Sequence, residues 1–139
     1  MTLPVYYTHK TKKGIETILV GMNKYERIDA FKRNNMKKYF YNLIAAKVKC
    51  HPLKGKVKTE YKYFYKNSQS DAPNVVAVID KMFMDALQNI NVIKDDNVLN
   101  YIGSSWSVGG QDKLNPRIEV TLIEVVEKQE EHPNQGKLI

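Results

Sequence analysis

The sequence predicts an α/β (α+β) fold in which a small mixed sheet of four to five strands packs with two main helices. Residues 56–66 alternate with a period of two, and two longer segments repeat apolar side chains about every 3.6 residues. With 139 residues, 42% of them hydrophobic, the chain is expected to form a single domain over residues 1–126. Residues 127–139 are charged and poor in apolar side chains, so a flexible tail is expected there.

The first elements are two short strands followed by a long helix. Residues 3–8 and 15–20 are strand-like and flank a basic turn at 10–14. Asn23 is expected to cap one helix over residues 24–48, with Glu26 as its capping-box partner. The apolar side chains that repeat with the helical period are Tyr25, Ile28, Met36, Tyr39, Phe40, Leu43 and Ile44.

The later elements are a strand, a second helix and two final strands. One face of the strand over residues 56–66 carries Val57, Thr59, Tyr61, Tyr63 and Tyr65. A helix over residues 72–88 follows, and residues 98–108 and 117–126 are predicted to form an antiparallel pair. The predicted order is therefore β-β-α-β-α-β-β.

Composition excludes several classes of protein. No run of 18 apolar residues is present, so no membrane-spanning helix is expected, and residues 1–5 lack the pattern of a secretory signal. Cys50 is the single cysteine, which excludes an internal disulfide and a cysteine-based zinc site. We expect Cys50 to be a small buried side chain in a cytoplasmic protein.

Charge is strongly polarised along the chain. Residues 1–66 contain 16 Lys and Arg against 4 Asp and Glu, whereas residues 67–139 contain 6 against 11. The second segment places five carboxylates on the second helix and the loop that follows it. Acidic side chains beside a basic surface suit a divalent metal held against a phosphate backbone, which is the pattern of a nuclease.

Helical geometry sorts the residues of the second helix. At about 100° per residue, one sector is apolar and must be the core face, with Val75, Ile79, Met82, Phe83, Ala86 and Ile90. A stripe beside it carries Asp71, Asn74, Lys81 and Asp85. Asp80 points about 180° from Asp71, so it is expected to be an ordinary solvated acid.

Asp95 and Asp96 can reach the start of that stripe. Residues 89–96, if extended, span roughly 26 Å, which matches the length of roughly 25 Å expected for the helix. Carboxylates gathered in this way would bind a hard divalent cation, and Lys81 could stabilise the charge of a phosphate. Each residue also has a simpler interpretation: Asp71 as a helix cap, Lys81 and Asp85 as a surface ion pair, and Asp95 to Asn97 as a turn.

The spacing resembles that of the RusA family of Holliday-junction resolvases, particularly members carried by bacteriophages. The family pattern is Asp-x-Asp-Asn, then a Lys followed by Asp-Ala-Leu, then an Asp-Asp pair. The matching residues here are Asp71-Ala72-Pro73-Asn74, Lys81, Asp85-Ala86-Leu87 and Asp95-Asp96. Met22 to Tyr25 before the first helix, and Gly109-Gly110 followed by Asn115-Pro116-Arg117, are also similar to phage-type members.

The resemblance covers residues 18–126 and implies an activity. Members of the family are small homodimeric endonucleases that require Mg²⁺ or Mn²⁺ and cut four-way DNA junctions in recombination and repair. It implies catalytic roles for Asp71, Lys81 and Asp96, and metal binding by Asp71, Asp95 and Asp96. Asn74 and Asp85 would be auxiliary, and the protein would be phage or prophage encoded and act in the bacterial cytoplasm.

The chain departs from the family pattern at Pro73, which stands where the motif has its second Asp. Proline offers no carboxylate, so metal binding should be weaker unless Asn74, Asp95 or a water molecule completes the site. A protein that binds junctions without cutting them is therefore an open alternative, and a protein-interaction factor without a DNA role is a third.

The basic half of the chain predicts a surface for the DNA backbone. The candidate phosphate-binding side chains are Lys24, Arg27, Lys32, Arg33, Lys37, Lys38, Lys58 and Lys62. No base-reading motif is present, so branched DNA would be recognised by its shape. The stripe of Tyr61, Tyr63 and Tyr65 can stack on unpaired bases or form the core face of a strand, and Trp106 has the same two interpretations, of which packing is favoured.

Overall fold

The computed structural model describes residues 1–95 and 97–125 and confirms a small α+β fold. The elements, in chain order, are β1 (Thr2–Pro4), β2 (Tyr6–Thr11), β3 (Gly14–Leu19), α1 (Met22–Arg27), α2 (Ala30–Lys47), β4 (Lys56–Tyr65), α3 (Ala72–Asn89), β5 (Tyr101–Gln111) and β6 (Arg117–Val125). In the described ranges, no helix is both long and apolar enough to cross a membrane.

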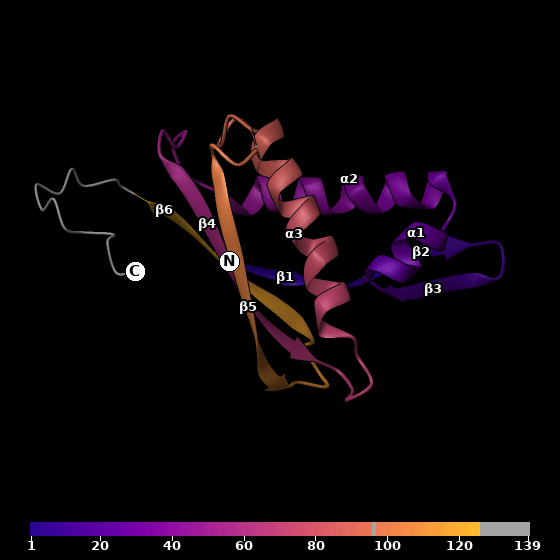
Figure 1. Cartoon of the computed structure of the whole chain (residues 1–139). Helices are drawn as coiled ribbons and strands as arrows, with labels where there is room; N and C mark the ends of the chain where they lie inside the picture. Colours follow the sequence, from indigo (N-terminus) through magenta and orange to yellow (C-terminus); the bar gives the residue numbers. More distant parts are fainter. Residues whose placement is uncertain (96, 126–139) are drawn as a thin grey trace, which may run out of the picture.

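Four strands form the main sheet in the order β1-β6-β4-β5 (Figure 1). β4 pairs antiparallel with β6 and parallel with β5. The prediction of a final antiparallel pair is therefore wrong, because β5 and β6 flank β4 on opposite sides. The cause is α3, which crosses over the sheet between β4 and β5 and so makes these two strands parallel.

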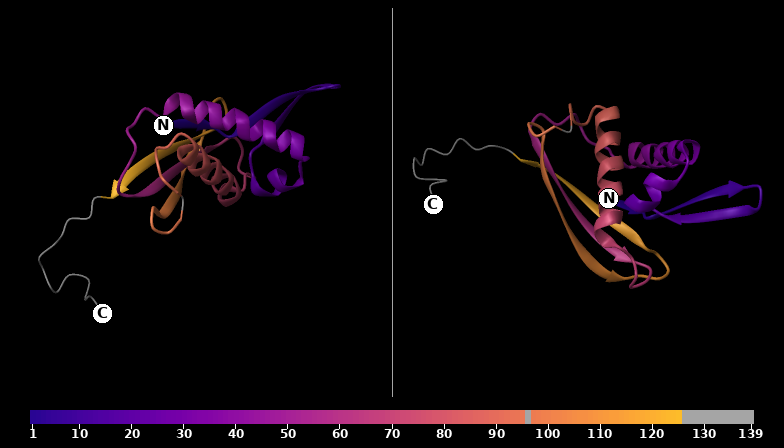
Figure 2. Two further views of the ribbon diagram at one scale, coloured as in Figure 1. Left: turned by 90° about the horizontal axis from the view of Figure 1, so that it is seen from above. Right: turned by 45° about the vertical axis from the view of Figure 1, so that its right-hand side comes forward.

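The N-terminal strand-like segment divides into two strands with different partners. β1 pairs with β6, whereas β2 pairs with β3 in a separate two-stranded sheet. Figure 2 shows this β2–β3 hairpin projecting from the rest of the domain. The predicted strands are thus present, although the first of them is interrupted at the buried Val5.

The predicted long helix is two helices. Asp29 caps the second of them, since its carboxylate accepts a hydrogen bond of 2.8 Å from the backbone nitrogen of Lys32. The N-cap position of α1 is Gly21, so the capping box expected from Asn23 and Glu26 is wrong. Arg33 on α2 holds the end of α1, because its guanidinium donates to the carbonyl oxygens of three residues, Tyr25, Glu26 and Ile28.

The core lies between the sheet and the helices. Val57, Thr59, Tyr61 and Tyr63 are buried on one face of β4, as the alternating pattern predicts. The predicted core residues of α3 are buried, apart from the half-buried Ile90, and Val76, Val78, Met84 and Leu87 are buried as well. α3 is covered on two sides because α2 packs across it from the side opposite the sheet (Figures 1 and 2).

Asp80 connects α3 to the sheet and is not the solvated acid that the sequence predicts. Its Oδ1 accepts hydrogen bonds from the hydroxyls of Tyr61 on β4 and Tyr101 on β5, the second at 2.7 Å. The hydroxyls of Tyr101 and Thr59 lie 2.7 Å apart. Burial raises the pKa of both tyrosines, and the charge of Asp80 raises the pKa of Tyr61 further. Asp80 points toward the sheet because the sheet covers a wider arc of α3 than the apolar sector suggested.

Replacing Asp80 should destabilise the fold. Asp80→Ala leaves two tyrosine hydroxyls without their acceptor, which should lower the free energy of unfolding by about 2–3 kcal/mol. Urea denaturation followed by circular dichroism measures the change. Glu60→Ala is the matched control, since Glu60 is an exposed acid on the other face of β4 and should change stability by less than about 0.5 kcal/mol. Equal unfolding midpoints for both variants would show that the network contributes nothing.

Candidate functional site

The predicted stripe of α3 borders the basic helices α1 and α2. Asp71 and Asn74 line a hollow of about 380 Å³ together with Lys24 of α1. Lys81 reaches the ring of Tyr25, also on α1. Asp85 lines a second hollow, of about 430 Å³, with Lys37 and Lys38 of α2. The four residues thus lie on one side of α3, as helical geometry predicted.

Asp71 occupies the N-cap position of α3, but its side chain makes no capping hydrogen bond there. Its Oδ2 accepts instead from the amide of Asn74, at 2.6 Å. Both side chains are accessible to solvent at the entrance of the hollow. The carboxylate is therefore held in place by Asn74 and directed outward, which the interpretation as a simple cap does not explain.

Three cations surround the ring of Tyr25. The distances to the ring centroid are 5.4 Å from Arg33 Cζ, 5.9 Å from Lys37 Nζ and 5.5 Å from Lys81 Nζ. Such contacts stabilise a cation by about 0.5–1 kcal/mol at accessible sites. Lys81 is thereby positioned above the ring, beside Lys37, and the two ammonium groups form a strongly positive surface.

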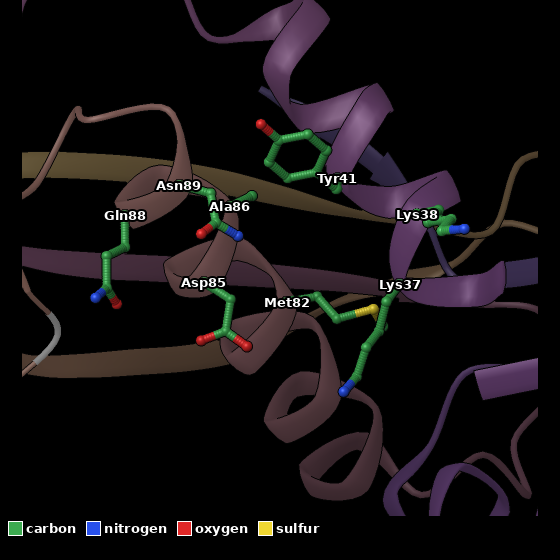
Figure 3. Close-up of a pocket in the computed structure, with 8 residues that line it drawn as sticks. All are labelled: Lys37, Lys38, Tyr41, Met82, Asp85, Ala86, Gln88 and Asn89. Atoms are coloured by element: carbon green, nitrogen blue, oxygen red, sulfur yellow. The ribbon is translucent and has the colours of Figure 1, made fainter. Parts of the chain in front are cut away.

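The second hollow lies between α2 and α3 (Figure 3). Lys37 reaches from α2 toward α3, and Asp85 projects from α3 on the same side of the hollow. Tyr41 and Met82 supply an apolar wall. An acidic side chain close to lysines fits the auxiliary role expected of Asp85 less directly than an electrostatic role at this junction of helices.

Asp95 does not lie beside Asp71. The backbone nitrogens of Val92 and Ile93 both bond to the carbonyl oxygen of Leu87, which keeps the chain at the end of α3. β5 then begins beside the start of β4, where Tyr101 pairs with Val57. The 18 residues of α3 span about 27 Å at 1.5 Å per residue, so the expected gathering of these two acids within one chain is wrong.

The reason is that β5, rather than the preceding loop, returns along α3. Asp95 lies in the turn that precedes β5 and accepts a hydrogen bond of 3.2 Å from Asn97, in accordance with the interpretation of this segment as a turn. Asp96 lies outside the described residues. Within residues 1–95 and 97–125, no group of three His, Cys, Asp or Glu side chains is arranged to hold a metal ion.

The candidate DNA-binding cations occupy two separate surfaces. Lys24, Arg27, Lys37 and Lys38 are exposed on α1 and α2. Lys58 and Lys62 are exposed on the face of β4 that no helix covers. A single continuous basic surface is therefore not formed.

Two of the predicted DNA contacts have structural partners. Lys32 forms an ion pair of 3.4 Å with Glu16 on β3, and Arg33 binds the end of α1. The sequence analysis missed the roles of Tyr25 and Arg33 because it joined α1 and α2 into one helix. Asp29, a favoured N-cap residue, was the signal that could have separated them.

The tyrosine stripe serves packing rather than base stacking. Tyr61 and Tyr63 are buried, and their hydroxyls bond to Asp80 and Ser70. Trp106, by contrast, is 45% exposed on β5, so the prediction that it is packed is wrong. Cys50 is also exposed rather than buried.

Comparison with known proteins found no protein-family model and no curated protein that matches the chain. The resemblance to RusA resolvases accordingly depends on the residues quoted for it.

Proposed function

We propose that the chain is a structure-specific endonuclease that cuts four-way DNA junctions with Mg²⁺ or Mn²⁺. It would act in recombination or repair in the bacterial cytoplasm, as the product of a phage or prophage gene. The observation that carries this proposal is the position of Lys81. This lysine lies on the same side of α3 as Asp71 and Asn74, with Lys24 and Lys37 nearby on the adjoining helices.

That arrangement suits a phosphodiester. The exposed lysines of α1 and α2 can neutralise backbone phosphates on either side of the bond to be cut. Lys81, fixed above the ring of Tyr25, would neutralise the charge that develops on the reacting phosphate. Recognition by backbone contacts is consistent with a preference for the shape of a junction over its sequence.

The donor set at the start of α3 allows a metal ion only in part. Asp71 offers one carboxylate, and Asn74 keeps it in place. Mg²⁺ is commonly held by one or two carboxylates together with water and substrate phosphates, so Asp71 can hold an ion if a second acid approaches from elsewhere. When bound, the ion would lower the pKa of a water molecule and neutralise phosphate charge.

A labelled four-way junction tests the proposal. The purified chain should cut it in 5 mM Mg²⁺ or Mn²⁺, about the upper range for such sites, and should leave it intact in EDTA. A linear duplex of the same sequence is the control and should survive. A junction that is neither cut nor retarded in a gel would overturn both the nuclease and any junction-binding role.

A second candidate is a junction-binding protein that does not cut. Pro73 favours it, since the position offers no carboxylate, and so does the lack of a three-acid cluster in the described chain. The same assay separates the two functions. A retarded band without cleavage, in either metal, would select the binding protein.

A further inference from the structure

β5 is a long sheet edge that nothing in the described chain covers. It ends the strand order β1-β6-β4-β5, and its 11 residues pair only with β4 among residues 1–95 and 97–125. An unpaired edge presents a row of backbone donors and acceptors to any strand that approaches. Natural edges are usually protected by a charged residue or a proline, and residues 101–111 contain neither.

The side chains of this edge are apolar and exposed. Ile102, Trp106 and Val108 are 47%, 45% and 49% exposed. Trp106 and Val108 pair with the buried Tyr61 and Tyr63, so they lie on the helix-bearing face of the sheet, beyond the cover of α3. A strip of this kind is typical of an interaction surface.

We propose that β5 pairs antiparallel with β5 of a second copy of this chain, which joins two four-stranded sheets into one of eight strands. The twofold axis would be perpendicular to the sheet and would pass near Ser105 and Trp106. Bulges at Ile102 and Gly109 bracket the regular segment between them, and this segment is centred on the same two residues. Each apolar strip would then meet its own copy on the same face of the sheet.

Charge distribution favours a second copy as the occupant. β5 is uncharged, and it lies in the half of the sequence that holds 11 acidic against 6 basic residues. The half with 16 basic residues forms the hairpin, α1 and α2 on the other side of α3 from β5 (Figure 1). Pairing through β5 keeps these basic halves far apart. The other sheet edge is β1, with three residues, so the assembly would close at two copies.

The pairing has a consequence for the acidic residues, which rests on the proposed nuclease function. α3 runs antiparallel to β5 (Figure 1), so the twofold places the start of one α3 at the same end of the sheet as the end of the other. Tyr65 and Gln111 are paired neighbours, and Gln111 would lie close to the start of the second copy's β5. Asp71 of each chain would thus approach the loop with Asp95 and Asp96 of the other.

Sedimentation of the full chain tests the pairing without any assay of activity. At tens of micromolar, the protein should sediment with twice the 16.1 kDa mass of one chain. Trp106→Glu should give monomers, because two carboxylates would meet near the axis. Leu114→Glu, which places the same charge at a residue that is 98% exposed in the loop after β5, should remain dimeric. Trp106 is the sole tryptophan, so its fluorescence should shift to longer wavelength as the dimer is diluted.

Cysteine cross-linking then locates the interface. In a Cys50→Ser background, single cysteines at positions 104, 105, 106 and 107 are oxidised, with Ser68→Cys as the exposed control. Only a residue on the axis has its Cα within about 4.4–6.8 Å of its own copy, so one position should cross-link and its neighbours should not. A monomeric wild-type protein, a dimer that Trp106→Glu leaves intact, or equal cross-linking at all five positions would each overturn the proposal.

Discussion

Lys81→Ala should reduce cleavage of four-way junctions by about 10²–10³-fold, the loss typical when one preorganised charge is removed from a transition state. Junction affinity should change little, since Lys81 is one of 22 Lys and Arg residues. The ammonium group lies 5.5 Å from the ring of Tyr25, which fixes its position relative to Asp71 and Asn74. Single-turnover cleavage and gel retardation of the same labelled junction measure the two quantities separately.

The matched control replaces Lys37 and Lys38 together. These lysines are exposed on α2, so their loss should weaken binding and reduce the salt dependence of affinity by about 0.9 for each phosphate contact removed. Cleavage at saturating protein should persist. If Lys81→Ala lowers affinity in step with cleavage, then Lys81 is a phosphate anchor and its catalytic assignment is wrong. An unchanged urea midpoint would show that either loss is not caused by unfolding.

Local pattern predicted much of the fold, and long-range pairing set the rest. The alternation of residues 56–66 identified β4 and its buried face, and the 3.6-residue period placed α3 within one residue of its end. The pairing of β5 with β4 was not predictable from alternation, because both parallel and antiparallel partners show the same period. The crossover of α3 decides it.

The candidate site shows the same division. The stripe of Asp71, Asn74, Lys81 and Asp85 follows from helix geometry alone and is present. The position of Asp95 depends on how the chain leaves α3, and the length of an extended segment gave only an upper limit on its reach. Asp80 was misassigned for a related reason, because the sequence does not reveal that Tyr61 and Tyr101 lie across from it.

Subunit mixing should restore cleavage to two inactive variants if each site is shared between chains. Asp71→Asn removes the acid at the start of α3, and the double variant Asp95→Asn, Asp96→Asn removes the acids beyond its end. Each homodimer should be inactive, since both of its sites lack a ligand. In a heterodimer of the two, one site combines both damaged elements, whereas the other contains Asp71 of one chain and Asp95 and Asp96 of its partner.

Heterodimers are obtained by co-expression with two different affinity tags and purification on both in turn. One intact site should nick a single strand of the junction, with about half of the wild-type initial rate, and should not cut the opposed strand. The basis is the antiparallel relation of α3 to β5, which in a β5-paired dimer brings opposite helix ends together, although they are about 27 Å apart in one chain. A heterodimer of Asp71→Asn with Lys81→Ala is the control, and it should remain inactive because both replacements affect the same end of α3. If the first heterodimer is as inactive as its parents while the wild-type protein cuts, then the acids of each site come from a single chain and the shared site is wrong.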